Sequence, residues 1–175
     1  MPEDAASQSM RLSGIVEESI VDGPGLRYVL FTQGCPHHCK GCHNPQTHSF
    51  DGGFLFTAED ALKQFEENPL LAGVTLSGGE PFAQAAPLCV VAQGVQSKGK
   101  TVITYTGYTF EDLWQRAQGD PWTARLLELT DLLIDGPYVE ELRDLELLFR
   151  GSSNQRLLSR QDRESLAMYL QTSKK

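Results

Sequence analysis

The sequence is short of cysteine, of positive charge and of long apolar runs, and each shortage excludes a class of protein. Four cysteines in 175 residues are too few for a disulfide-rich secreted domain. The 15 lysine and arginine residues are outnumbered by 23 aspartate and glutamate residues, and the net charge of −8 argues against general binding of nucleic-acid phosphates. No apolar run approaches a membrane span, and residues 1–10 lack the apolar core of a secretory signal. We therefore expect a cytoplasmic protein, in a reducing compartment that suits free thiols, with neither a membrane nor a nucleic acid as partner.

Length and composition predict a single globular domain. The chain is long enough for a substantial core, and its 40% hydrophobic and 22% charged residues are ordinary for such a domain. We expect a loose tail at 1–10 and one domain over 11–175. The sequence contains neither an internal repeat nor a low-complexity segment.

Segments with strand and helix patterns alternate along the chain. β-branched and apolar runs predict strands at 11–18, 26–32, 73–77, 101–105 and 132–134. Apolar stripes and capping residues predict helices that begin after Thr57 and cover 85–96, 110–116, 122–129 and 160–170. This alternation indicates an α/β fold with parallel strands. The units are too few for eight β/α repeats, so we expect an incomplete (open) β/α barrel.

Three of the cysteines are crowded into one loop after the predicted strand at 26–32. Cys35, Cys39 and Cys42 have the spacing C-x3-C-x2-C, one thiolate short of a filled four-ligand site. A cubane iron–sulfur cluster on three cysteines keeps one iron free to bind a small molecule and pass it an electron. A Cys3His zinc site in a non-catalytic interaction module is the alternative, because three histidines lie close by: His37, His38 and His43.

A glycine turn, Gly78-Gly79-Glu80-Pro81, follows the predicted strand at 73–77. Two glycines allow the backbone to approach a ligand closely, and Glu80 offers an acceptor for an ammonium group. In an α/β sheet this turn and the cysteine loop share the carboxyl edge, where ligands bind. Taken alone, the two glycines are better explained by a strand-to-helix connection that binds nothing, and it is the neighbouring cysteine loop that makes the turn a candidate pocket wall.

The cysteine spacing followed by Gly-Gly-Glu-Pro resembles the radical S-adenosylmethionine enzymes, which have an open β/α barrel. The resemblance implies a 4Fe–4S cluster on Cys35, Cys39 and Cys42, whose free iron chelates the amino and carboxylate groups of S-adenosylmethionine. It also implies that Gly78, Gly79 and Glu80 lie along the methionine moiety.

Further motifs resemble the glycyl-radical-enzyme activases within that superfamily, and two of them resemble the branch that acts on anaerobic ribonucleotide reductase. The resemblance implies reductive cleavage of S-adenosylmethionine, and the resulting radical then removes a hydrogen from the Cα of a glycine in the reductase. It implies a flavodoxin- or ferredoxin-type electron donor and no catalytic side-chain acid or base. Another glycyl radical enzyme, such as pyruvate formate-lyase, is the alternative partner. The activase motifs are Asp22-Gly-Pro-Gly-x-Arg27, Gly34-Cys35 and Cys42-His43-Asn44-Pro45, and the branch motifs are Asp135–Val139 and Arg150–Arg156.

One position departs from the superfamily pattern, which usually has an aromatic residue before the third cysteine. Gly41 stands there, which resembles the ribonucleotide reductase branch and leaves the adenine to backbone contacts. We expect His43 to face the cofactor through its backbone and His37 and His38 to be solvated. We expect Cys89, on an apolar helix, to be a core residue. The polar segment 150–156 is expected to recognise the partner or to close over the cofactor.

Overall fold

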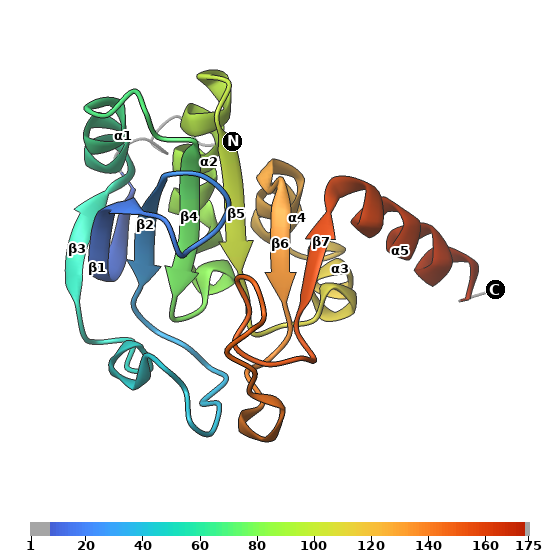
Figure 1. Cartoon of the computed structure of the whole chain (residues 1–175). Helices are drawn as coiled ribbons and strands as arrows, with labels where there is room; N and C mark the ends of the chain where they lie inside the picture. Colours follow the sequence, from blue (N-terminus) through green and yellow to red (C-terminus); the bar gives the residue numbers. More distant parts are fainter. Residues whose placement is uncertain (1–7, 174–175) are drawn as a thin grey trace.

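The computed structural model describes residues 8–173 and shows an α/β fold built on one seven-stranded sheet (Figure 1). The strand order across the sheet is β3-β1-β2-β4-β5-β6-β7. Because β3 and β7 are its two edges, the sheet is open. The α/β prediction is therefore confirmed. The strands are β1 (Ser9–Ser19), β2 (Arg27–Thr32), β3 (Phe54–Thr57), β4 (Gly73–Gly78), β5 (Thr101–Tyr105), β6 (Leu132–Asp135) and β7 (Arg156–Ser159).

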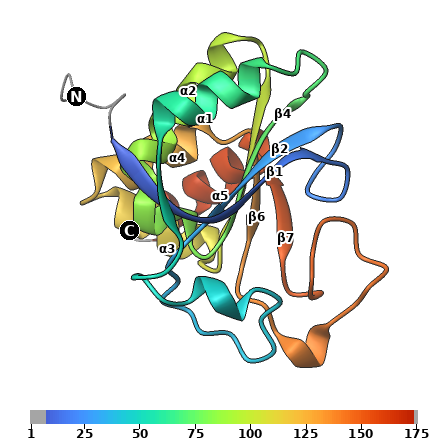
Figure 2. The same ribbon diagram turned by 90° about the vertical axis from the view of Figure 1, so that its left-hand side faces the viewer.

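The four central strands, β2, β4, β5 and β6, run parallel to one another. Strand β1 pairs antiparallel with β2 and with β3, and β7 pairs antiparallel with β6. The loops that follow the parallel strands consequently gather at one end of the molecule, at the bottom in Figure 2. Such a carboxyl edge is where α/β sheets bind ligands.

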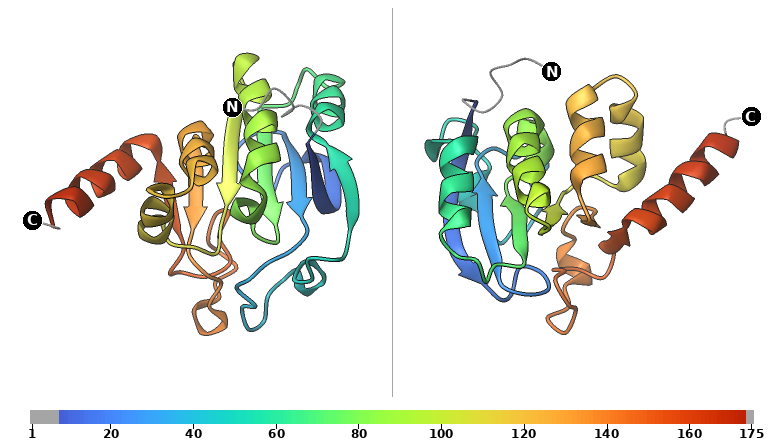
Figure 3. Two further views of the ribbon diagram at one scale, coloured as in Figure 1. Left: turned by 180° about the vertical axis from the view of Figure 1, so that it is seen from behind. Right: turned by 90° about the horizontal axis from the view of Figure 1, so that it is seen from above.

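The helices that connect the strands cover one face of the sheet, as the right-hand view of Figure 3 shows. Thr57, Thr109 and Ser159 cap their helices by accepting a hydrogen bond from a backbone N–H, as expected for such residues. Leu30, Leu76 and other alternate strand residues meet the helices in the buried core. The helices are α1 (Ala58–Glu66), α2 (Ala85–Ser97), α3 (Phe110–Ala117), α4 (Pro121–Leu129) and α5 (Arg160–Thr172), with 3-10 turns at Pro45–Thr47, Pro81–Gln84 and Glu140–Leu142.

The opposite face of the sheet is covered by a loop at one end and left for a cavity at the other. Residues 20–26 lie over it: Thr75 Oγ1 donates to the Asp22 carbonyl at 2.8 Å, and a Cβ on Gly23 would reach Ile103 Cδ1 at 2.4 Å. Two residues further along the parallel strands, Phe31, Ser77 and Tyr105 line the cavity. Side-chain alternation along each strand thus divides core from site.

Arg27 ends the Asp-Gly-Pro-Gly-x-Arg motif, and its role in this structure is architectural. Its side chain is fully buried at the amino ends of the parallel strands. The guanidinium donates to Thr75 Oγ1 at 3.2 Å, to Thr101 Oγ1 at 2.7 Å and to the Val74 carbonyl at 2.6 Å. Because these partners lie on β4 and β5, Arg27 joins three strands at the end opposite the cavity.

Two strands and one boundary differ from the sequence expectations. The short strands β3 and β7 were not predicted, since four residues carry too little periodicity. The expected tail at 1–10 is too long at its inner end, because β1 begins at Ser9 and Met10 is buried in the core. The rest of that tail, residues 1–7, lies outside the described residues.

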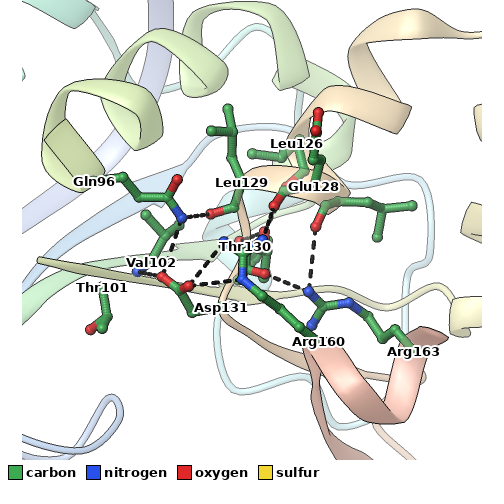
Figure 4. A network of polar contacts seen from close by, with 12 residues as sticks. Gln96, Thr101, Val102, Leu126, Glu128, Leu129, Thr130, Asp131, Arg160 and Arg163 are labelled. Carbon is green, nitrogen blue, oxygen red and sulfur yellow. Dashed lines mark hydrogen bonds and ion pairs between the residues drawn. The ribbon is translucent and has the colours of Figure 1, made fainter. Parts of the chain in front are cut away.

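A polar network fastens α5 to the sheet (Figure 4). Asp131 accepts hydrogen bonds from the Val102 N–H at 2.8 Å and from Arg160 Nε at 3.0 Å. The buried Arg163 donates to the carbonyls of Leu158, at 2.8 Å, and of Thr130. Burial lowers the pKa of Arg163 to about 10. These bonds place the start of α5 against the end of α4.

We predict that Arg163→Met lowers the free energy of unfolding by about 2–4 kcal/mol, because buried carbonyls lose a charged donor. Arg160→Met is the matched control, and its half-exposed ion pair is worth about 1 kcal/mol or less. Urea titration of the reduced, iron-free protein measures both. Equal losses of unfolding free energy in the two variants would contradict the conclusion that Arg163, more than Arg160, holds α5 against the sheet.

Candidate functional site

One cavity of about 410 Å³ lies at the carboxyl edge of the parallel strands, and all three cysteines of the C-x3-C-x2-C motif line it. Gly78 and Gly79 line the same cavity. The register explains the meeting, because Thr32 at the end of β2 pairs with Gly78 at the end of β4. The structure therefore brings together two motifs that are more than thirty residues apart in the sequence.

Backbone bonds close the cysteine loop on itself. The Gly34 N–H donates to the Thr47 carbonyl at 2.7 Å, and the Cys35 N–H donates to the His48 carbonyl at 3.2 Å. The buried Gln33 side chain adds a clamp by donating to the Gln46 carbonyl at 3.0 Å. These contacts fix the stretch that carries the thiols at the end of β2.

The three thiols differ in exposure, since Cys39 and Cys42 are partly exposed. Cys35 is buried, and desolvation raises the pKa of its thiol, while the backbone N–H groups of His37 and His38 lower it. The Asn44 N–H donates to Cys42 Sγ at 3.4 Å. Within residues 8–173, no three His, Cys, Asp or Glu side chains converge on a single-ion site. A three-cysteine cluster takes one thiolate per iron, so its thiols lie around the cluster and do not converge on a single ion.

The glycine turn touches the cysteine loop itself. The Gly79 N–H donates to the Thr32 carbonyl at 2.7 Å, and the Glu80 N–H donates to the Gly34 carbonyl at 2.9 Å. A Cβ on Gly79 would lie 2.3 Å from the Gly34 carbonyl oxygen, and Gly78 has φ +93°. Close approach of the cysteine loop, in addition to any ligand, therefore demands these glycines. Gly79→Val would push the two loops apart.

Glu80 does not line the cavity, and its carboxylate is fully buried among protein donors. It accepts from His37 Nε2 at 2.6 Å, from Thr106 Oγ1 at 2.9 Å, and from the backbone N–H groups of Gly107 at 2.9 Å and Phe82 at 3.1 Å. Direct contact between Glu80 and an ammonium group stays a prediction. The geometry shows a carboxylate that joins the segments after β2, β4 and β5.

His37 corrects a sequence expectation. Only 16% of its side chain is exposed, its ring meets Tyr108 edge-on with centroids 4.4 Å apart, and it lines the cavity. His38 is exposed as expected, at φ +49°. Nothing in the sequence distinguishes these two adjacent histidines, because Glu80, the partner of His37, lies 43 positions away.

Gly41 and His43 sit differently with respect to the cavity. Gly41 has φ +72° and faces the 140–142 turn, since a Cβ there would lie 2.8 Å from Glu140 Oε1. It does not line the cavity, whereas His43 does. The His43 ring tilts against Tyr138 with centroids 4.8 Å apart. A contact of either residue with a cofactor stays a prediction.

The segment 150–156 was expected to recognise a partner or to close over the cofactor, and its bonds mainly build the loop that covers the cavity. Gln155 Oε1 accepts from the Gly151 N–H at 2.8 Å, and Asn154 Nδ2 donates to the Pro137 carbonyl at 2.7 Å. Arg156 pairs with the buried Asp135 at 2.5 Å and with Glu111 at 2.7 Å, which raises the pKa of Arg156. Arg156, at the start of β7, thus links this strand to β6 and to α3.

Gly151 and Gln155 of that segment line the cavity, and so does Arg150. Its Nε is shielded from solvent without a hydrogen-bond partner, and its Nη1 reaches the Gln155 carbonyl only at 3.4 Å.

Cys89 lies elsewhere, buried in the core as predicted, where burial raises the pKa of its thiol to about 12. The structure therefore separates the three loop thiols from the fourth.

Comparison with known proteins gives a consistent result. Residues 21–158 match the family described as a 4Fe-4S single cluster domain. An anaerobic ribonucleoside-triphosphate reductase-activating protein of Salmonella typhimurium is 34% identical over 160 residues, covering 83% of this chain and 96% of the relative. Proteins of the same name from Escherichia coli K12 and Enterobacteria phage T4 are 35% and 36% identical over 144 and 148 residues, covering 78% and 81% of this chain and 90% and 89% of theirs.

We predict that Arg156→Gln lowers the free energy of unfolding by about 2–4 kcal/mol, because the buried Asp135 carboxylate loses its cation. Arg150→Gln is the matched variant from the same segment, and its expected loss is below about 1 kcal/mol. Urea titration of the iron-free protein gives both values. An Arg156→Gln protein as stable as the unaltered chain would contradict the structural role of Arg156 and favour a role in recognition.

Proposed function

The chain belongs to the family of anaerobic ribonucleoside-triphosphate reductase-activating proteins, and from this premise we propose that it activates an anaerobic ribonucleotide reductase. The activity proposed is that of a radical S-adenosylmethionine oxidoreductase. It cleaves S-adenosylmethionine reductively and removes a hydrogen atom from a glycine Cα of the reductase, which leaves a glycyl radical. The radical S-adenosylmethionine barrel type belongs to the same proposal.

One observation carries the proposal: the three loop thiols and the two glycines of the turn, Gly78 and Gly79, line a single cavity at the carboxyl edge of parallel strands. A bound 4Fe–4S cluster would supply the single electron that breaks a carbon–sulfur bond of S-adenosylmethionine. Cys35, Cys39 and Cys42 would hold this cluster. The match to a 4Fe-4S family favours it over a zinc site.

The remaining lining residues orient the small molecule and exclude water. Gly78 and Gly79 present backbone without side chains to the cavity. Leu147 and Phe149, from the loop between β6 and β7, and Phe31, from β2, give it an apolar wall. An apolar wall protects a reactive radical from solvent.

Partners follow from the chemistry and from the relatives. A flavodoxin- or ferredoxin-type protein is the proposed electron donor, in a reducing cytoplasm where the thiols stay free. The names of the relatives favour the ribonucleotide reductase branch over activation of pyruvate formate-lyase. None of the helices within residues 8–173 is long and apolar enough to cross a membrane.

Anaerobic mixing with the reductase tests the proposal. The reconstituted protein, dithionite and S-adenosylmethionine should produce a glycyl radical signal on the reductase by electron paramagnetic resonance. Omission of S-adenosylmethionine is the control. A reductase that stays silent while S-adenosylmethionine is cleaved would redirect the assignment to another glycyl radical enzyme, and colourless protein with one bound zinc would contradict it.

We predict that Cys35→Ala, Cys39→Ala and Cys42→Ala each lose most of the bound iron and all cleavage of S-adenosylmethionine, because each thiolate anchors one iron. Cys89→Ala is the control and should retain both, since this thiol is buried in the core away from the cavity. Iron analysis and quantification of released methionine measure the two properties. A loop variant with full iron content would remove that cysteine from the ligand set.

A further inference from the structure

The hydrogen bond between His37 and Glu80 joins the cysteine loop to the sheet from inside the protein. His37 Nε2 donates to Glu80 Oε2 at 2.6 Å, and the Glu80 side chain has no exposed surface. Glu80 also binds Thr106 and Gly107 after β5 and caps the turn that leads into α2. The histidine between two cysteines is thus attached to the point where three strands end.

We propose that His37 is a positioning residue, which sets the cysteine loop against the glycine turn and so places the cluster relative to S-adenosylmethionine. The inference rests on the proposed function, because it assigns a residue to that same site. His37 acts through Glu80 and ligates no iron.

The histidine ring is held on more than one side. It meets Tyr108 edge-on with centroids 4.4 Å apart, and the guanidinium carbon of Arg116 lies 4.5 Å from the centre of the Tyr108 ring. A Cβ on Gly107 would approach His37 Cδ2 to 2.4 Å, so this glycine makes room for the ring. A side chain enclosed in this way has one orientation available, which is what a positioning role requires.

Other ties at this part of the loop are weak. Lys40 lies 3.6 Å from Glu140 and 3.8 Å from Glu141, but its side chain is 81% exposed. Exposed ion pairs of this kind contribute little to stability. A buried bond to a carboxylate is among the stronger single hydrogen bonds, so His37 makes the main side-chain attachment here, beside the backbone bonds of Gly34 and Cys35.

Loss of the His37 bond should separate two properties of the site. The three thiols are local to one loop that Gln33 and Gly34 also fix, so cluster assembly should survive. Binding of S-adenosylmethionine needs the cluster and the glycine turn at a fixed separation, and small misplacements weaken such binding strongly. The expected signature is normal iron with weakened ligand affinity.

His38 provides a matched control one position along the chain. It lies between the same two cysteines, but its side chain is exposed and its ring contacts His48 with centroids 4.9 Å apart. Both histidines therefore have the same chance of being iron ligands by spacing, and only one reaches Glu80. A comparison of the two separates positioning from a general effect on the loop.

The experiment compares His37→Ala, His37→Gln and His38→Ala with the unaltered chain under anaerobic conditions. Iron per chain, the dissociation constant for S-adenosylmethionine and the change that this ligand causes in the paramagnetic spectrum of the reduced cluster are measured. We expect His37→Ala to keep its iron and to bind S-adenosylmethionine about tenfold or more weakly, the equivalent of one buried charged hydrogen bond. His37→Gln should recover most of the affinity, because its amide can donate to Glu80, and His38→Ala should match the unaltered chain.

A second readout needs neither iron nor S-adenosylmethionine. In the iron-free protein, thiol-alkylation rates report how firmly the loop is held, and we expect Cys39 to react faster in His37→Ala than in His38→Ala. Equal affinities and equal alkylation rates in these two variants would overturn the inference, as would loss of iron in His37→Ala alone. If the unaltered chain fails to bind S-adenosylmethionine, the proposed function fails, while alkylation still decides the role of His37.

Discussion

The buried carboxylate of Glu80 is the constraint on which the rest of the site depends. A charge taken out of water is costly unless hydrogen bonds occupy its oxygens, and here donors from three separate segments do so. Those donors follow β2, β4 and β5 in the chain, so satisfying one carboxylate brings three loops together. The cysteine loop is positioned by the need to bury Glu80 with partners, and the cavity lies beside that junction.

The second constraint is the unequal cover of the sheet. Helices pack on one face and bury alternate strand residues such as Leu30 and Leu76. On the other face, residues 20–26 cover the amino-terminal half of the strands, and Arg27 joins them there. Phe31, Ser77 and Tyr105 are left to line a cavity at the carboxyl end. The cavity therefore lies at the carboxyl end, where residues 20–26 leave that face of the sheet free and the loop between β6 and β7 covers it.

The polar segment 150–156 after β6 is held by hydrogen bonds within the protein. Arg156, Gln155 and Asn154 bond to Asp135, Gly151 and Pro137, and these bonds shape the loop that covers the cavity. His43 and Tyr138 pack between this loop and the cysteine loop. Arg150 lines the cavity, and its shielded Nε has no hydrogen-bond partner among the described residues.

The sequence by itself determined the α/β class, most of the element positions, the set of three neighbouring thiols and the separation of Cys89 from them. These depend on local periodicity, on capping residues and on spacing within one loop, all of which are properties of short stretches. The tertiary structure decided which side chains meet across long separations: His37 with Glu80, Arg156 with Asp135, and Gly79 with the Gly34 carbonyl. The short edge strands β3 and β7 belong with these, since pairing with a neighbour stabilises them. No local pattern marks such partners, because the free energy that selects them comes from burial and from hydrogen bonds made only when the sheet has formed.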